Sequence, residues 1–124
     1  MSLTRANTEA ELVSRQKSRM EAVSMVVTVI GSNADLNSPM GFAVRKMGGT
    51  VAAFSSVADA DLTFLDEADF DQFLDIAEYR LMLNIKGRWG VVDTKIGPRT
   101  ESLSQFAEDL EHDIARKLTD LQSM

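Results

Sequence analysis

The sequence predicts a mainly α-helical protein: a small bundle with long N-terminal, central and C-terminal helices and one short β-prone connector. Three observations favour this fold class. Apolar residues recur at three- and four-residue spacing in several segments, capping patterns precede those segments, and only 50–57 and 89–96 look β-prone. With 124 residues, 44% of them hydrophobic, the chain has the length and composition of one helical domain over residues 1–124.

The first predicted helix runs from about Glu9 to Ile30, after a flexible N-terminus of residues 1–8. Thr8 and Glu11 have the spacing of a capping box, which satisfies two amide donors at a helix start. The second half, residues 23–30, is β-branched and apolar nearly all round. That half must be buried on several sides or form a strand.

A short second helix is predicted from Pro39 to Met47. Ser38 is placed to cap it, and proline is favoured at the first helical position. Residues 31–37 before it have turn composition, and Gly48-Gly49 ends it. Thr50 to Val57 then forms a strand or an extended link.

The central helix has the clearest pattern. Acids occupy residues 66–69 at its start and Lys86-Gly87 stands at its end, each sign being favoured there by the helix dipole. The residues that recur at helical spacing are Phe70, Phe73, Leu74, Ala77, Leu81, Asn84 and Ile85, with a second apolar edge at Ile76 and Leu83. We therefore expect this helix to be contacted from two sides.

Residues 88–98 contain two glycines, a proline and the pair Val91-Val92, so they predict a loop or short hairpin within a connector arm at 87–99. The last helix is predicted from about Ser102, which has capping-box spacing to Gln105, to the C-terminus. Its apolar stripe is Leu103, Phe106, Ala107, Leu110, Ile114, Leu118 and Leu121.

Composition argues against most catalytic chemistry. The chain has no cysteine and a single histidine, His112, which excludes thiolate chemistry, disulfides and multi-histidine metal sites. Two Asp/Asn clusters, 33–37 and 59–63, alternate oxygen ligands but lack the turn glycine of a calcium loop, so helix capping explains them better. We expect no enzyme activity, no cofactor and no metal site. The longest apolar run, 22–30, is too short to cross a membrane.

Charge is segregated along the chain. Residues 47–79 carry eight acids and no base, whereas residues 80–99 carry five bases and one acid. A net charge of −6 and a pI near 4.7 argue against a protein that grips DNA through its phosphates. These blocks are either solvated helix faces or complementary surfaces that meet between neighbouring subunits.

The second interpretation supplies a set of candidate interface residues. The basic and apolar candidates are Arg80, Lys86, Arg88, Trp89, Val91, Lys95 and Arg99, and the acidic candidates are Asp66, Asp69, Asp71 and Asp75. Trp89 has a second interpretation, as a side chain that folds back over the core. As an interface residue it would be an anchor, because tryptophan and arginine are enriched among binding hot spots.

Residues 69–81 (DFDQFLDIAEYRL), 97–105 (GPRTESLSQ) and 114–117 (IARK) carry a resemblance at the level of pattern. Over roughly residues 9–122 the chain resembles small head-to-tail connector, or adaptor, proteins of tailed bacteriophages. The resemblance implies a structural protein of the virion neck, made in the host cytoplasm.

Such adaptors form a homo-oligomeric ring, typically dodecameric, between the portal protein and the next tail or stopper protein. DNA passes through the ring without specific binding, and no membrane is involved. The alternative is a non-enzymatic helical interaction or regulatory module that works as a monomer or dimer.

Overall fold

The computed structural model describes residues 4–28, 31, 33–51, 57–96 and 101–122, with the backbone alone for 90–96 and 101–107. The protein is mainly helical, as predicted, and these ranges contain no strand. The four α-helices are α1 (Arg5–Ala22), α2 (Asn37–Lys46), α3 (Phe70–Ile96) and α4 (Glu101–Gln122). Three short 3₁₀ helices, η1 (Ala34–Leu36), η2 (Asp59–Leu62) and η3 (Glu67–Asp69), stand in the connections.

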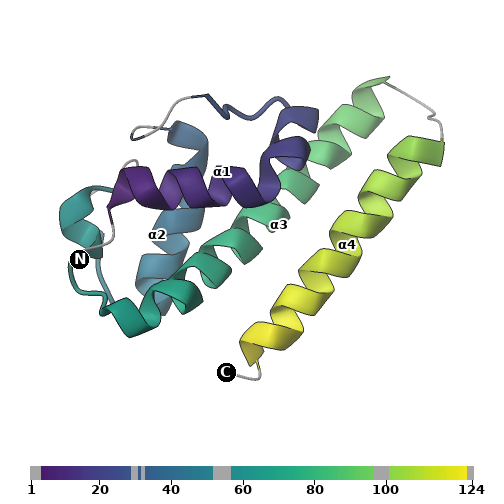
Figure 1. Cartoon of the computed structure of the whole chain (residues 1–124). Coiled ribbons are helices and arrows are strands. Elements are labelled where there is room, and N and C mark those ends of the chain that lie inside the picture. Colours follow the sequence, from purple (N-terminus) through teal and green to yellow (C-terminus); the bar gives the residue numbers. More distant parts are fainter. Residues whose placement is uncertain (1–3, 29–30, 32, 52–56, 97–100, 123–124) are drawn as a thin grey trace.

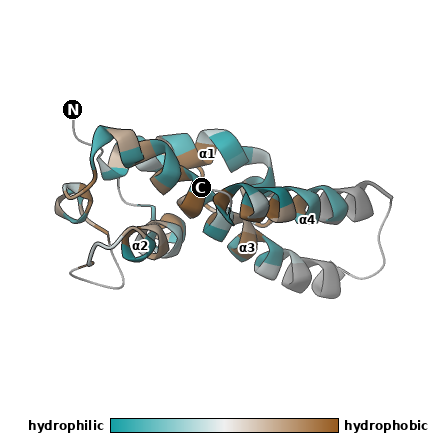
Figure 2. Cartoon of the chain, turned by 90° about the horizontal axis from the view of Figure 1, so that it is seen from below, coloured by the Kyte–Doolittle hydropathy of each residue, from teal (hydrophilic) through white to brown (hydrophobic). Residues whose placement is uncertain are grey.

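Helix α3 is the central element, because α1, α2 and α4 all pack against it (Figure 1). Hydrophobic residues concentrate where these helices meet (Figure 2). The predicted positions Phe73, Leu74, Ala77, Leu81 and Ile85 are all buried, which confirms the apolar stripe of the central helix. Other large buried side chains of the core are Leu12, Met20, Leu36, Met40, Leu62, Met82 and Leu110.

Helix α1 begins four residues earlier than predicted. Thr4, not Thr8, is the N-cap, and its hydroxyl accepts a hydrogen bond from the Asn7 backbone N–H at 3.2 Å. Thr8 lies buried inside the helix and its hydroxyl donates to the Thr4 carbonyl. The flexible N-terminus predicted for residues 1–8 is therefore wrong for residues 5–8, which are helical.

The prediction that the first helix continues to Ile30 is also wrong, because α1 ends at Ala22. Residues 23–28 are neither helix nor strand, and Ser24 adopts a left-handed backbone with φ 61°. β-branched side chains lose rotamer freedom in a helix, which favours an end before the valine run. Polar partners satisfy the loop backbone instead: the Val26 N–H donates to Asp35, and the Val26 carbonyl accepts from Asn33.

Helix α2 begins at Asn37, so Ser38 lies inside the helix and does not cap it. Its end agrees with the prediction: Gly48 has φ 92°, a left-handed conformation that glycine adopts without steric cost. The structure does not show a strand at residues 50, 51 or 57, and 52–56 lie outside the described residues.

The predicted connector arm is the largest correction. Helix α3 continues without interruption through Gly87 and Trp89 to Ile96, so the loop or hairpin predicted from residue 88 is helical up to that point. Leu81, Ile85 and Trp89 stand four residues apart and continue the face that packs on the core. That burial outweighs the roughly 1 kcal/mol that each helical glycine costs. The rest of the predicted connector, 97–99, lies outside the described residues.

Candidate functional site

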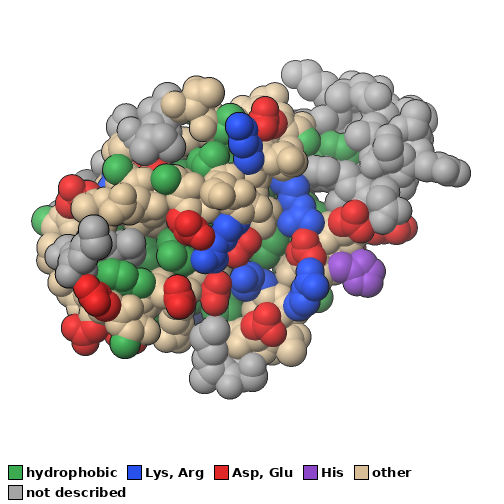
Figure 3. All heavy atoms as spheres, viewed as in Figure 1, with side chains coloured by type: hydrophobic (Ala, Val, Ile, Leu, Met, Phe, Trp, Pro, Cys, Tyr) green, Lys and Arg blue, Asp and Glu red, His purple; other side chains and the backbone are tan. Residues whose placement is uncertain are grey.

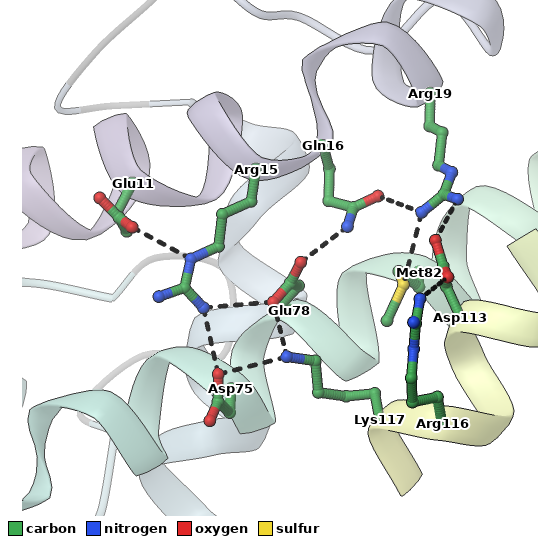
Figure 4. Close-up of polar contacts among 10 residues, drawn as sticks. All are labelled: Glu11, Arg15, Gln16, Arg19, Asp75, Glu78, Met82, Asp113, Arg116 and Lys117. Atoms are coloured by element: carbon green, nitrogen blue, oxygen red, sulfur yellow. Dashed lines mark hydrogen bonds and ion pairs between the residues drawn. The ribbon is translucent and has the colours of Figure 1, made fainter. Parts of the chain in front are cut away.

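Charged and polar side chains from three helices meet where α1 crosses α3 and α4 runs beside it (Figures 1 and 4). We call this group the polar cluster. It consists of Glu11, Arg15, Gln16, Arg19, Asp75, Glu78, Asp113, Arg116 and Lys117. In the space-filling view, acidic and basic side chains alternate across this part of the surface (Figure 3).

Glu78 is the centre of the polar cluster and is only 8% exposed. Its carboxylate accepts hydrogen bonds from the Gln16 amide at 2.7 Å and from Arg15 at 3.2 Å, and it pairs with the Lys117 ammonium at 3.0 Å. Gln16 interrupts the regular geometry of α1, with φ −126° and ψ 19°, so α1 is kinked at the residue that reaches Glu78. Asp75, one turn earlier on α3, binds the same two cations.

The surroundings of Glu78 and Lys117 favour their charged forms. Burial alone would raise the pKa of Glu78, but hydrogen bonds from Gln16 and Lys117 and the charges of Lys117 and Arg15 outweigh it and lower that pKa. Burial alone would lower the pKa of Lys117, but Glu78 and Asp75 raise it. Both groups are therefore ionised over the whole neutral range.

A second carboxylate ties α1 to α4 directly. Asp113 of α4 pairs with Arg19 of α1 and with Arg116 of its own helix. Burial opposes ionisation of Asp113, yet the hydrogen bonds and charges of these two arginines lower its pKa. Every acid of the polar cluster thus faces a cation, which is the arrangement of a structural clamp.

The polar cluster lines part of a surface hollow. The hollow beside it, of about 240 Å³, is lined by Gln16, Glu78, Met82, Asp113, Arg116, Lys117 and Asp120. The carboxylates of Glu78 and Asp113 already pair with cations, and no group of three potential metal ligands occurs among the described residues. His112 stands exposed on α4 and is not part of the hollow.

A buried arginine organises the opposite end of α1. Arg5 is 6% exposed and donates to the carboxylate of Glu9, to Asn37 and to the carbonyls of Asn33 and Val57. Glu9, fully buried, also accepts the Asn33 backbone N–H at 2.9 Å. In the polar turn at 33–37, Asn33 caps η1, as predicted for this cluster, and the turn also anchors Arg5 and Glu9. Sequence reasoning missed Arg5 and Glu9 because buried ion pairs leave no periodic signal.

Several candidate interface residues have partners within their own chain. Lys86 pairs with Glu111 of α4 at 3.2 Å, and Arg88 pairs with Asp35 at 2.8 Å. Asp75 belongs to the polar cluster. The structure also packs the partly buried Trp89 against the core, which favours its interpretation as a core-covering side chain.

The other acidic candidates lie on one exposed segment. Asp66 and Asp71 are exposed and Asp69 is half-buried, at the junction of η3 and α3. Beside them Phe64 is 42% exposed, and its ring lies against Gly49, where an added Cβ would come within 2.5 Å of it. Figure 3 shows acidic side chains gathered at this end of the molecule. We call residues 59–71 the acidic segment.

Arg80 differs from the other basic candidates because its described contact is with an aromatic ring. Its guanidinium carbon lies 5.2 Å from the centre of the Phe42 ring, and the Lys46 ammonium lies 5.5 Å from the same centre. Sequence reasoning missed Phe42 and Lys46, since nothing in the chain order places α2 against Arg80.

The other three candidates have side chains outside the described residues. Val91 and Lys95 lie in α3 where the structure describes the backbone, and Arg99 lies outside the described residues.

Among the described helices, none combines the length and the apolar character needed to span a bilayer.

Comparisons with known protein families, curated protein sequences and solved structures found nothing that matches this chain.

Proposed function

We propose that this chain is a structural, non-catalytic head-to-tail connector protein of a tailed bacteriophage. It assembles as a homo-oligomeric ring, dodecameric by analogy with the adaptors it resembles, between the portal protein and the next tail or stopper protein. DNA passes through the ring without specific binding. The protein works in the neck of the virion.

The observation that carries this proposal is the acidic segment with its half-exposed aromatic ring. Phe64 offers apolar area, and the surrounding acids offer charge that the described part of the chain does not neutralise at Asp66 or Asp71. Aromatic residues are enriched in protein interfaces, and the rim of an interface is polar, so an exposed aromatic ring with polar neighbours supports a contact surface here. Acids left outside the contacts would repel phosphate from the channel wall and keep DNA mobile.

The helical frame is suited to a static role. α3 holds the other three helices, and the polar cluster clamps α1 and α4 to it with charge-assisted hydrogen bonds. A rigid subunit of this kind can present its surfaces in a fixed orientation, as a closed ring requires.

The experiment that tests the proposal is multi-angle light scattering behind size exclusion, over a range of protein and salt concentrations, followed by electron microscopy of any assembly. A ring-shaped oligomer that loosens as salt rises supports the proposal, because exposed ion pairs are screened. A protein that stays a monomer or a closed dimer at all concentrations supports the alternative, a helical interaction or regulatory module.

A further inference from the structure

Two cations from different helices share one aromatic ring on the surface of this protein. Phe42 and Lys46 stand one turn apart on α2, and Arg80 reaches the ring from α3. The distances to the ring centre are 5.2 Å for the guanidinium and 5.5 Å for the ammonium. Cation–ring attraction occupies the face of a guanidinium and leaves its in-plane N–H groups free to donate.

Among the described residues, Arg80 lacks the carboxylate partner that five other arginines have. The arginines with a carboxylate within ion-pair distance are Arg5, Arg15, Arg19, Arg88 and Arg116. In the described residues no carboxylate pairs with Arg80, and its buried Nε–H has no acceptor. Lys46 is exposed and is likewise without a carboxylate there. Within the described residues, two cations at one ring therefore have no carboxylate partner, although the chain has a net charge of −6.

The ligand chemistry that fits these two cations is a carboxylate. Carboxylates of a partner would compensate the charges of the ammonium and the guanidinium, and a planar guanidinium binds carboxylates with good geometry. The acidic segment supplies carboxylates of this kind at Asp66 and Asp71, which are exposed and unpaired within the described residues. A second copy of the chain therefore carries the complement of the site.

We infer that Phe42, Lys46 and Arg80 form a carboxylate-binding site that receives the acidic segment of a neighbouring copy. This inference rests on the proposed ring, for which it names the contact between subunits. A contact between two unlike surfaces of identical chains repeats from copy to copy and closes a ring when the rotation permits. The half-exposed Phe64 beside the acids adds apolar area to the same contact.

Zero-length carbodiimide cross-linking tests the contact directly, because it joins only an amine and a carboxylate that touch. Equal amounts of ¹⁴N- and ¹⁵N-labelled full-length protein are mixed, reassembled and cross-linked, and the peptides are identified by mass spectrometry. We expect mixed-isotope peptides that join Lys46 to Asp66, Asp69 or Asp71. Lys17, exposed on α1, is the internal control and should give none. Oligomers without mixed-isotope Lys46 peptides overturn the inference.

Charge reversal gives the second arm of the test. We expect Lys46→Glu combined with Arg80→Gln to weaken self-association by about tenfold or more, and Lys17→Glu to leave it unchanged. Circular dichroism and urea midpoints check that each variant is folded. Adding the Asp66→Lys, Asp71→Lys variant to Lys46→Glu protein should restore mixed assembly.

The outcomes separate the site from the proposed function. If the wild type forms rings and the Lys46 and Arg80 substitutions leave them intact, the site is wrong and the ring stands. If the mixed-isotope peptides arise from a closed dimer, the ring is wrong and the site stands. A wild type that is monomeric at every concentration overturns both.

Discussion

Replacing Glu78 with alanine tests whether the polar cluster holds α1 and α4 on the central helix. The carboxylate of Glu78 is almost completely buried and contacts two helices besides its own. Alanine has a high helix propensity, so α3 itself is not weakened by the substitution. The loss of stability then reports the lost contacts.

The expected loss of stability depends on which contacts Arg15, Lys117 and Gln16 keep after Glu78 is removed. Breaking a buried ion pair costs ~3–5 kcal/mol when one charge is left without compensation. Arg15 and Lys117 keep Asp75 as a partner and are 26% and 21% exposed, so solvent and Asp75 reduce their share. The Gln16 amide is buried and loses its acceptor, which costs ~1–3 kcal/mol. We expect Glu78→Ala to lower the free energy of unfolding by about 2–3 kcal/mol.

Urea denaturation followed by circular dichroism measures this difference. The matched control is Glu11→Ala, which removes a carboxylate that also binds Arg15 but is 48% exposed, and should cost less than ~0.5 kcal/mol. A double-mutant cycle with Lys117→Met should show a coupling energy above ~0.5 kcal/mol. Equal small effects of the Glu78 and Glu11 substitutions would refute the reasoning.

Three further predictions follow from the same structure. The pKa values of Glu78 and Asp113 are lowered in the folded state, so the free energy of unfolding should fall as the pH drops below their ordinary values of 4.5 and 3.8. Urea midpoints measured against pH should show this loss, and the loss should be smaller in Glu78→Gln. Phe73→Ala and Leu81→Ala, both at fully buried positions, should each cost ~2–5 kcal/mol, and unchanged denaturation midpoints would contradict the central place of α3. Gly87→Ala should raise the free energy of unfolding by ~0.5–1 kcal/mol, because residue 87 is helical and the space around the new Cβ is open. Gly49→Ala should lower the free energy of unfolding, because the Phe64 ring must move.

Periodic apolar patterns predicted the parts of the fold that depend on one face of a helix. The stripe through Phe73, Leu81 and Ile85 is buried as expected, because burial at helical spacing is a property of the segment itself. Leu110 of α4 is buried and Ile114 and Leu121 pack partly against the core, while Leu118 is 38% exposed. The side chains of Leu103, Phe106 and Ala107 lie outside those described.

Element boundaries depended on contacts that the local sequence does not reveal. Helix α1 starts at Arg5 because distant groups hold that residue: its backbone N–H donates to Asp59, and its side chain reaches Val57. Thr8 has capping-box spacing to Glu11, but the structure uses Thr4, which is followed three residues later by Asn7. The glycines near residue 88 predicted a break that the packing of Trp89 against the core overrides.

The helical course of 87–96 changes what the basic block of residues 80–99 can do. On a helix, residues turn by about 100° each, so cations six and eight residues apart point in different directions instead of forming one arm. The structure shows this divergence: Arg80 meets Phe42 of α2, Lys86 meets Glu111 of α4, and Arg88 meets Asp35 of η1. Two of these three cations, Lys86 and Arg88, form ion pairs within their own chain. The surface that we propose for a partner, at Arg80 and Lys46, combines residues of two helices, and a scan of charge along the sequence cannot find it.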